Sequence, residues 1–487
     1  MDTRKKNIVI ALMVAMFLGA VEGTVVTTAI PTIVKDLHGF EIISLVFSIY
    51  LLTSAISTPI YGKLSDQFGR KNVLSIGIVI FLIGSILCGL SKSMYMLIAF
   101  RALQGLGAGS IFTITYTIIG DEFSLEERPK VQGGIGTVWG VASLLGPFLG
   151  GFLINVLSWH WIFFINIPFG ILSIVLLQKS LKETFQKKRV KIDFAGIIVL
   201  SMAMMMFLNI FLDSGSFGLQ KNVFIILSIG ATALLLILFY FIERKAKEPI
   251  IPFEIFTKTI INVNLISFLL SAILIGVDVY MAIYIQNILG FSPTISGLAM
   301  APMSVAWLMS SVILGKCIMS YGEKAVIMIS VFTLFISTLL FATLNVNTAL
   351  PLVVLFSFVM GFGLGGAFTT LTIVVQTSVE YNKRGAATAT NSLLRTLGQT
   401  IGVSIFGGIF NADIANYFNK IGINGIDNSN LYSTASKMGV TGEQITLSLN
   451  NATHIIFIIF VLIAILCLIL TVVLPKVIHK KFLEQLN

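Results

Sequence analysis

Charged residues are scarce in this sequence of 487 residues, since Asp, Glu, Lys and Arg together make up only 11% of it. A soluble globular domain carries about 25%. Hydrophobic residues reach 56% and the mean hydropathy is +0.96. Apolar runs of about 20 residues, the length of a membrane-spanning helix, follow one another almost from end to end. The composition therefore predicts an all-α polytopic membrane protein, because helices satisfy their own backbone hydrogen bonds in lipid.

Residues that form disulfides or bind metals are equally few. The 3 cysteines lie in or beside apolar runs and the 4 histidines are scattered, so neither set has the spacing of a metal site. The sequence contains no G-x-x-x-x-G-K-[ST] loop, which argues against ATP-driven transport. It also shows no His/Asp/Ser constellation, which argues against an enzyme. We expect no metal and no cofactor.

Fourteen apolar stretches are long enough to span a membrane, and an even number places both termini on one side. If that side is the inside, the inner segments hold 25 of the 32 Lys and Arg residues and the outer loops hold 5. Positive charge collects on the cytoplasmic side. The net charge of +10 therefore indicates cytoplasmic termini rather than nucleic-acid binding. The predicted spans are approximately 7–30, 43–62, 73–91, 95–120, 132–156, 159–178, 193–213, 222–242, 260–288, 294–316, 325–345, 349–376, 387–411 and 453–474.

An internal repeat relates the two ends of the chain. The stretch Gly62–Lys71 recurs 253 residues later, and the glycines of Gly105–Gly109 recur 256 residues later. Gly146 and Gly151 also have glycines 256 residues on. Repeated halves of this kind form transporters with a midplane site and alternating access. We predict six-helix halves at 1–178 and 259–487, a basic linker with two inserted helices at 179–258, and a long outer loop at about 412–452.

Two carboxyl groups lie inside predicted spans, where charges are costly and usually functional. Glu22 and Asp278 are 256 residues apart, so the repeat makes them symmetry mates. We predict that they carry protons and the charge of a substrate in turn; the alternative is that each is a structural carboxyl. Arg101 also lies in a span and needs a buried partner. Glu22 is a candidate, directly or through Gln104; alternatively, Arg101 ties helices together through backbone carbonyls.

The stretch from Gly62 to Lys71 is predicted to be a short charged loop that acts as a conformational latch. Its glycines allow sharp turns, and its acid and bases can pair with each other and with helix ends. The alternative is an ordinary positively charged inner loop. The proposed gating residues are Gly62, Asp66, Gly69, Arg70 and Lys71.

Small residues in the fifth span predict close packing and a kink, because glycine admits a neighbouring backbone and proline removes a donor. We likewise interpret the Gly105–Gly109 run as helix packing and not as a nucleotide loop. The fifth-span residues are Gly133, Gly146, Pro147, Gly150 and Gly151. Candidates for a binding cavity, mostly polar or aromatic residues within spans, are Gln104, Trp139, Asn166, Tyr280, Tyr284, Gln286 and Gln376.

Taken together, these motifs resemble those of the fourteen-helix drug:proton antiporters of the major facilitator superfamily. Gly62–Lys71 is similar to the signature loop between helices two and three, and Arg101 with Gln104 to the fourth-helix motif. Glu22 stands where the first-helix motif usually has Asp. Gln67 replaces the usual base in the loop, which should weaken the latch, and Ala142 replaces a glycine of the fifth-helix motif.

The resemblance implies proton-driven multidrug efflux, and hence drug resistance, across a bacterial plasma membrane. The exported compounds would be hydrophobic and cationic, and the proton gradient would supply the energy. We expect a monomer whose partners are small-molecule substrates, protons and the lipid bilayer. Export of one defined metabolite, such as an amino acid, a peptide or a lipid-like molecule, is the open alternative. A membrane-embedded enzyme or sensor is a remote one.

Overall fold

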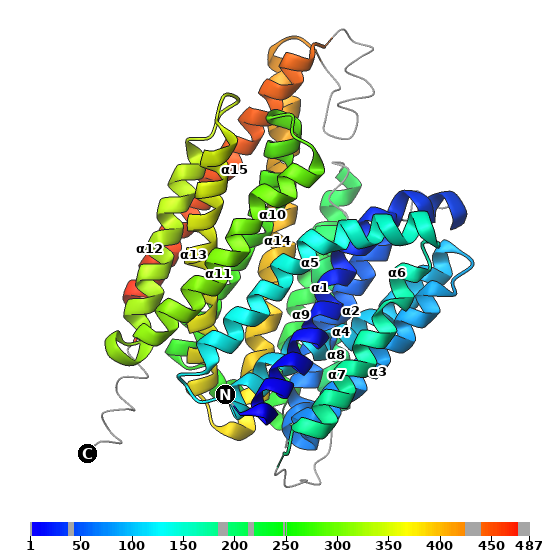
Figure 1. Cartoon of the computed structure of the whole chain (residues 1–487), viewed down its shortest axis with the longest axis vertical. Coiled ribbons are helices and arrows are strands. Elements are labelled where there is room, and N and C mark those ends of the chain that lie inside the picture. The colour runs from blue at the N-terminus through cyan, green and yellow to red at the C-terminus, as the bar shows by residue number, and fades with distance from the viewer. Residues whose placement is uncertain are drawn as a thin grey trace. The chain divides into compact units, whose positions relative to one another are not determined.

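The computed structural model describes residues 2–37, 43–183, 193–212, 219–246, 249, 251–423 and 440–475. These ranges are helical almost throughout and contain no strand (Figure 1). The predicted all-α fold is therefore confirmed. The side chains of some helical residues, Pro147 among them, lie outside the description, and so does the kink predicted there.

The helices follow the apolar runs of the sequence. They are α1 (Thr3–Leu37), α2 (Ile43–Phe68), α3 (Arg70–Gly89), α4 (Met94–Glu122), α5 (Arg128–Val156), α6 (Trp161–Phe164), α7 (Asn166–Ser180), α8 (Phe194–Leu212), α9 (Leu219–Lys245), α10 (Lys258–Ile283), α11 (Pro293–Tyr321), α12 (Glu323–Ala342), α13 (Leu350–Thr377), α14 (Arg384–Lys420) and α15 (Gly442–Val473), with short helical segments η2 (Phe253–Ile255), η3 (Tyr284–Ile288) and η4 (Tyr381–Lys383).

Each predicted span coincides with one of these helices, with α6 and α7 together forming the sixth. Over the described residues, 12 helices are long and apolar enough to cross a membrane. α8 is described over a shorter apolar stretch, Phe194–Phe207. The chain is thus a multi-pass helical protein, and the number fourteen stays a prediction.

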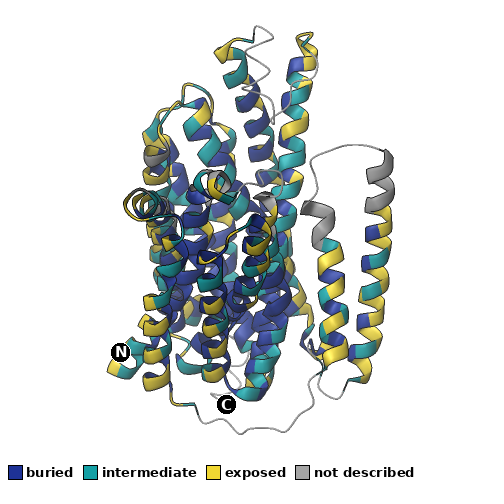
Figure 2. Ribbon diagram, turned by 90° about the vertical axis from the view of Figure 1, so that its right-hand side faces the viewer, coloured by how far each residue is buried: buried dark blue, intermediate teal, exposed yellow. Residues whose placement is uncertain are grey.

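The chain forms two compact units. The first comprises Met1–Ile261 and Thr372–Leu393, and the second comprises Asn262–Leu371 and Leu394–Asn487. The short returning segment Thr372–Leu393 belongs to the first unit, with which it shares the polar contacts described below. The predicted boundaries at 178 and 258 stay a prediction. Buried residues line the sides of helices that face their neighbours, and exposed residues line the outer sides (Figure 2).

Glycines of α4 let two neighbouring helices approach its backbone closely. A Cβ at Gly105 would collide with the backbone of α2 at Tyr50, and a Cβ at Gly107 would collide with the backbone of α3 at Phe81. Small residues allow such approach where helices pack in a membrane. The interpretation of this glycine run as helix packing is therefore confirmed.

The second unit repeats this arrangement in α13. A Cβ at Gly361 would collide with the backbone of α11 at Met303, and a Cβ at Gly363 with the backbone of α12 at Leu334. Met303 and Leu334 stand 253 residues after the corresponding contacts in the first unit. The repeat seen in the sequence is thus a repeat of backbone contacts.

Gly146, in the glycine motif of α5, is a position of close approach. A Cβ at Gly146 would collide with the side chain of Thr24, so this glycine lets α5 pack against α1. Gly133 and Gly150 are buried. Gly151 has open space where a Cβ would lie, so close packing does not require glycine there.

The loop predicted at Gly62–Lys71 is in fact almost entirely helical. α2 continues to Phe68 and α3 begins at Arg70, so Gly69 alone separates them. Its φ of +92° and ψ of 145° belong to a region that is essentially confined to glycine. Gly322, with φ of +81°, separates α11 from α12 in the same way. The latch residues therefore sit on helix ends instead of a loop.

The long outer loop predicted at about 412–452 is shorter than expected. α14 continues to Lys420 and α15 begins at Gly442, while residues 424–439 lie outside the described ranges. Thr441 and Gln444 form a capping box that starts α15. The prediction was wrong at both ends because it took polar composition as a sign of loop, whereas a helix that leaves the membrane can continue with polar residues.

We predict that Gly107→Ala lowers the thermal unfolding midpoint of the detergent-purified protein, because the added methyl group meets backbone atoms that cannot move aside. The cost of such overpacking is about 1–3 kcal/mol. Gly151→Ala is the matched control, since its methyl group enters open space. Equal midpoints for the two variants would contradict the packing role of Gly107.

Candidate functional site

Glu22 of α1 lies inside the first unit and not on an open surface. Its side chain is only 1% exposed, as is that of Arg101 from α4. Nη1 of Arg101 donates to Oε1 of Glu22 at 2.5 Å. The predicted pairing of these residues is confirmed, and it is direct.

The second carboxylate oxygen of Glu22 is also satisfied. Nδ2 of Asn166, on α7, donates to Oε2 of Glu22 at 2.8 Å and to Oγ of Ser85 at 3.0 Å. Ser85 donates in turn to the carbonyl of Phe163 at 2.8 Å. Asn166, expected to line a cavity, is thus buried as a partner of Glu22.

Arg101 has further contacts that hold it in place. It donates to the carbonyl of Val46 at 3.1 Å and to Oε1 of Gln104 at 2.9 Å. Its guanidinium lies 4.2 Å from the ring centroid of Tyr50. A buried ion pair is tolerated only when additional hydrogen bonds satisfy its remaining groups. The Glu22 network, made of Glu22, Arg101, Gln104, Asn166, Ser85 and Tyr50, meets that condition with residues from five helices.

The charge balance of this network depends on the protonation state of Glu22. A proton added to Glu22 would remove the negative charge that balances Arg101, and one hydrogen bond to the carboxylate would be lost. Arg101 would then need a different acceptor, which requires side chains or helices to move.

Asp278, the symmetry mate of Glu22, has different surroundings. It lies on α10 and its side chain is exposed. In the described part of the chain it forms no ion pair. The residue 256 positions after Arg101 is Ser357, which cannot supply a charge. The repeat therefore preserves the carboxyl and omits its arginine.

Arg395 of α14 takes part in an aromatic stack of the second unit. Its guanidinium lies 4.0 Å from the ring centroid of Phe368, and Phe368 stacks on Trp307 at 5.4 Å. In the first unit Trp139 stacks on Phe112 at 5.6 Å. Arg395 and Phe368 stand 256 residues after Trp139 and Phe112. The guanidinium of Arg395 therefore stacks on Phe368 in the second unit where the ring of Trp139 stacks on Phe112 in the first.

The remaining cavity candidates of the second unit lie near the end of α10. Tyr280 is buried and packs against Phe410 at 5.2 Å between ring centroids. Tyr284 is buried and donates to the carbonyl of Asn345 at 2.7 Å. Both tyrosines are thus placed as packing residues, whereas Gln286 is partly exposed in the π-helical segment η3.

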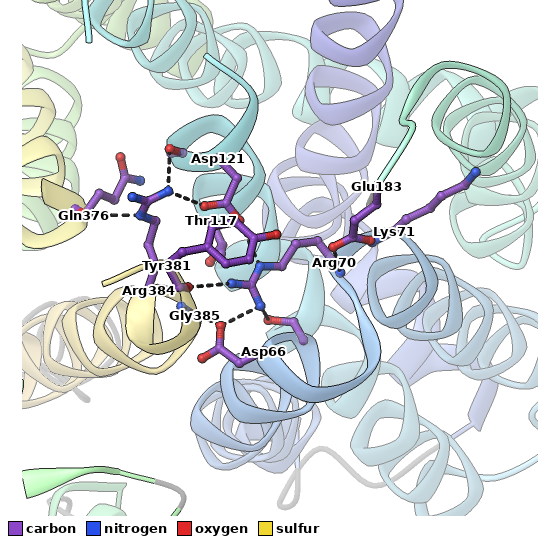
Figure 3. Close-up of polar contacts among 12 residues, drawn as sticks. Asp66, Arg70, Lys71, Thr117, Asp121, Glu183, Gln376, Tyr381, Arg384 and Gly385 are labelled. Atoms are coloured by element: carbon purple, nitrogen blue, oxygen red, sulfur yellow. Dashed lines mark hydrogen bonds and ion pairs between the residues drawn. The ribbon is translucent and has the colours of Figure 1, made fainter. Parts of the chain in front are cut away.

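A second group of buried charges joins α2, α3 and α4 to the returning segment of the first unit (Figure 3). Nη1 of Arg70 pairs with Asp66 at 2.5 Å, and Nε of Arg70 pairs with Asp121 at 3.0 Å. Arg384, the first residue of α14, pairs with the other oxygen of Asp121 at 2.5 Å. We call Asp66, Arg70, Asp121 and Arg384 the Asp66 cluster.

The carboxylate of Asp66 also holds the beginning of α14. It accepts hydrogen bonds from the backbone amides of Gly385 at 3.0 Å and Ala386 at 2.9 Å. The first amides of a helix have no partner within the helix, and the helix dipole favours an anion at that end. The predicted pairing of Asp66 with Arg70 and with a helix end is therefore confirmed.

Two other expected residues are placed near this cluster. Gln376 is completely buried at the end of α13 and donates to the carbonyl of Tyr116 at 2.7 Å, so it belongs beside the Asp66 cluster and not to a midplane cavity. Lys71 donates to the carbonyl of Gln178 at 2.7 Å and forms no ion pair with Asp66. Gln67 is buried, and its amide makes no hydrogen bond among the described residues, so it adds nothing to the latch.

Sequence reasoning missed three members of this region: Asp121, Arg384 and Glu183. Glu183 accepts hydrogen bonds from the amides of Arg70 at 2.8 Å and Lys71 at 3.2 Å, which caps α3. The sequence does mark these residues, because each is a charge at the end of an apolar run. It does not show that Asp121 pairs with Arg384, since the two residues are 263 positions apart.

Similarity to known proteins identifies the family to which this chain belongs. The model of the Major Facilitator Superfamily matches residues 12–403. The chain belongs to the major facilitator superfamily. It is therefore a membrane transporter and not an enzyme.

Curated relatives include several multidrug transporters. Multidrug resistance protein 3 of Bacillus subtilis (strain 168) is 37% identical, over 82% of this chain and 79% of that protein. Multidrug transporter protein MdtP of the same organism is 34% identical, over 85% and 77%. Multidrug efflux pump SdrM of Staphylococcus aureus (strain N315) is 30% identical, over 85% and 93%. These similarities agree with the antiporter family that the motifs indicate.

Solved structures share the fold of this transporter. The human organic anion transporter MFSD10 (TETRAN) matches with a TM-score of 0.66 at 14% identity, covering 97% of this chain and 100% of that one. The proton:xylose symporter XylE matches with a TM-score of 0.62 at 14% identity, covering 96% of each. At this identity the likeness establishes the fold alone.

We predict that Asp66→Asn speeds hydrogen exchange in a peptide covering residues 381–390 by about tenfold or more. The reason is that hydrogen bonds from backbone amides to a charged group contribute about 1.5–3 kcal/mol, and Asn keeps the shape while losing the charge. Glu126→Gln, an exposed carboxyl between α4 and α5, is the control. Unchanged exchange in Asp66→Asn would show that the carboxylate does not hold α14.

Proposed function

We propose that this transporter is a proton-coupled multidrug efflux antiporter, which exports hydrophobic cationic compounds by alternating access. The observation that carries the proposal is the Glu22 network, in which a completely buried carboxylate pairs with one arginine and with no other cation among the described residues. The names of the curated relatives support the choice of multidrug substrates.

Glu22 is the proposed proton carrier. A carboxylate within the membrane is costly unless it is paired or protonated. Release of Arg101 on protonation links the proton to a rearrangement of helices α1, α4 and α7. Binding of a proton from one side and its release to the other would then drive the cycle.

Asp278 is the proposed reader of substrate charge. It is exposed and has no arginine at the position related by the repeat, so its charge is available to a ligand. A cation binding near it would gain an attraction that a neutral compound lacks. Of the two symmetry-related carboxyls, Glu22 would thus carry the proton and Asp278 would attract the cationic substrate.

The Asp66 cluster is the proposed gate. Any rearrangement that moves the beginning of α14 away from Asp66 breaks the two hydrogen bonds that the backbone amides of Gly385 and Ala386 donate to Asp66. It also separates Arg384 from Asp121. These contacts form or break together, so the segment has two arrangements instead of a continuum. Opening of this gate would expose the proposed substrate pathway on the side of the first unit where the N-terminus lies.

Glu22→Gln is expected to abolish proton-coupled efflux while leaving the amount of folded protein nearly unchanged. Like the protonated carboxyl, the amide lacks the negative charge that balances Arg101, and it cannot exchange a proton. The measurement is protonophore-sensitive uptake of a fluorescent cationic dye into inside-out vesicles, normalised to folded transporter. Glu126→Gln is the matched control, and it should transport like the wild type.

Normal dye uptake by Glu22→Gln would remove Glu22 from the coupling mechanism. A wild-type protein that folds well but moves no dye would refute the multidrug proposal and favour export of one defined metabolite.

Asp278→Asn is expected to reduce transport of cationic compounds by about tenfold and to leave neutral compounds within twofold of the wild type. One charge attraction of about 1.4 kcal/mol corresponds to a factor of ten. The measurement compares a cationic and a neutral dye of similar size in the same vesicles. An equal loss for both dyes would count against a charge-reading role for Asp278.

A further inference from the structure

A pocket of about 890 Å³ lies at one end of the first unit, apart from the Glu22 network. The last turns of α2, the first turns of α3 and the end of α7 line it. α3 packs against both α2 and α7 (Figure 1). The pocket therefore lies where three predicted spans meet the membrane boundary.

One wall of the pocket is apolar. It includes Tyr61, Leu64 and Phe68 of α2 and Ile76 of α3. Ile76 is 55% exposed, although it lies inside a span. This wall presents an apolar surface to whatever surrounds the helices, and in a membrane that is hydrocarbon.

The rim of the pocket is basic. It carries Lys71, Lys179 and Lys182, with Glu183 as the acid. The Glu183 carboxylate already accepts the two amides at the start of α3, at 2.8 and 3.2 Å. Lys179 and Lys182 are exposed and form no ion pair within the described ranges. The rim thus has two ammonium groups that no acid of the described residues pairs with.

We propose that this pocket binds an anionic phospholipid from the leaflet on the side of the N-terminus. Its acyl chains lie along the apolar wall and its phosphate contacts Lys179 and Lys182. The pairing of apolar and cationic surfaces selects this ligand, because a free phosphate leaves the apolar wall unused. A zwitterionic lipid brings its own cation and gains less from the lysines.

The test uses the full-length protein, purified in nonionic detergent and depleted of lipid. The thermal unfolding midpoint is measured against increasing phosphatidylglycerol, with phosphatidylcholine and inorganic phosphate as separate probes. Phosphatidylglycerol is expected to raise the midpoint at lower concentration than phosphatidylcholine. Each lysine near an anionic group contributes about fivefold in affinity, so Lys179→Gln/Lys182→Gln should need about 25-fold more phosphatidylglycerol.

The control is Lys245→Gln/Lys258→Gln, two exposed lysines that do not line the pocket and should leave the titration unchanged. Ile76→Trp fills the apolar side without altering charge and should also weaken phosphatidylglycerol binding. Three results would overturn the proposal. The first is that phosphatidylcholine raises the midpoint at the same concentration as phosphatidylglycerol, and the second is that the control variant loses as much affinity for phosphatidylglycerol as the Lys179→Gln/Lys182→Gln variant does. The third is that millimolar phosphate alone reproduces the shift in midpoint. The readout needs no transport, so the result is independent of the proposed function.

Discussion

A charge that is buried among membrane-spanning helices is cut off from water, so its partner must come from another helix of the same protein. Glu22 and Arg101 meet this constraint with side chains that are each 1% exposed. Asn166 and Gln104 complete the hydrogen bonding, which fixes α1, α4 and α7 against one another. The pair is therefore more than a local contact, because a shift of α1 or α4 would separate the two buried charges.

The same constraint acts at the helix ends, with a different solution. Asp66 is balanced partly by Arg70 and partly by the first amides of α14, which is a helix dipole used as a counter-charge. These contacts join the segment Thr372–Leu393 to the rest of the first unit, although its neighbours in sequence belong to the second.

The two repeated halves share their backbone contacts but differ in their charged residues. Backbone contacts at the glycines of α4 recur in α13, since close approach depends only on the absence of a side chain. Charges do not recur in the same way. Ser357 stands where the first unit has Arg101, and Arg395 stands where it has Trp139. Two similar halves can thus hold one paired and one exposed carboxyl.

The sequence by itself determined the helical class, the approximate position of each helix, the repeat and which charges lie within apolar runs, because each of these depends on composition and spacing along the chain. It also indicated the partner of Arg101, since few acids lie within spans. Only the tertiary structure decided that Gly69 alone separates α2 from α3, that α14 and α15 extend into the expected loop, and that Asp121 pairs with Arg384. Those features depend on contacts between residues far apart in sequence and on how far a helix continues beyond its apolar run, and local hydropathy specifies neither.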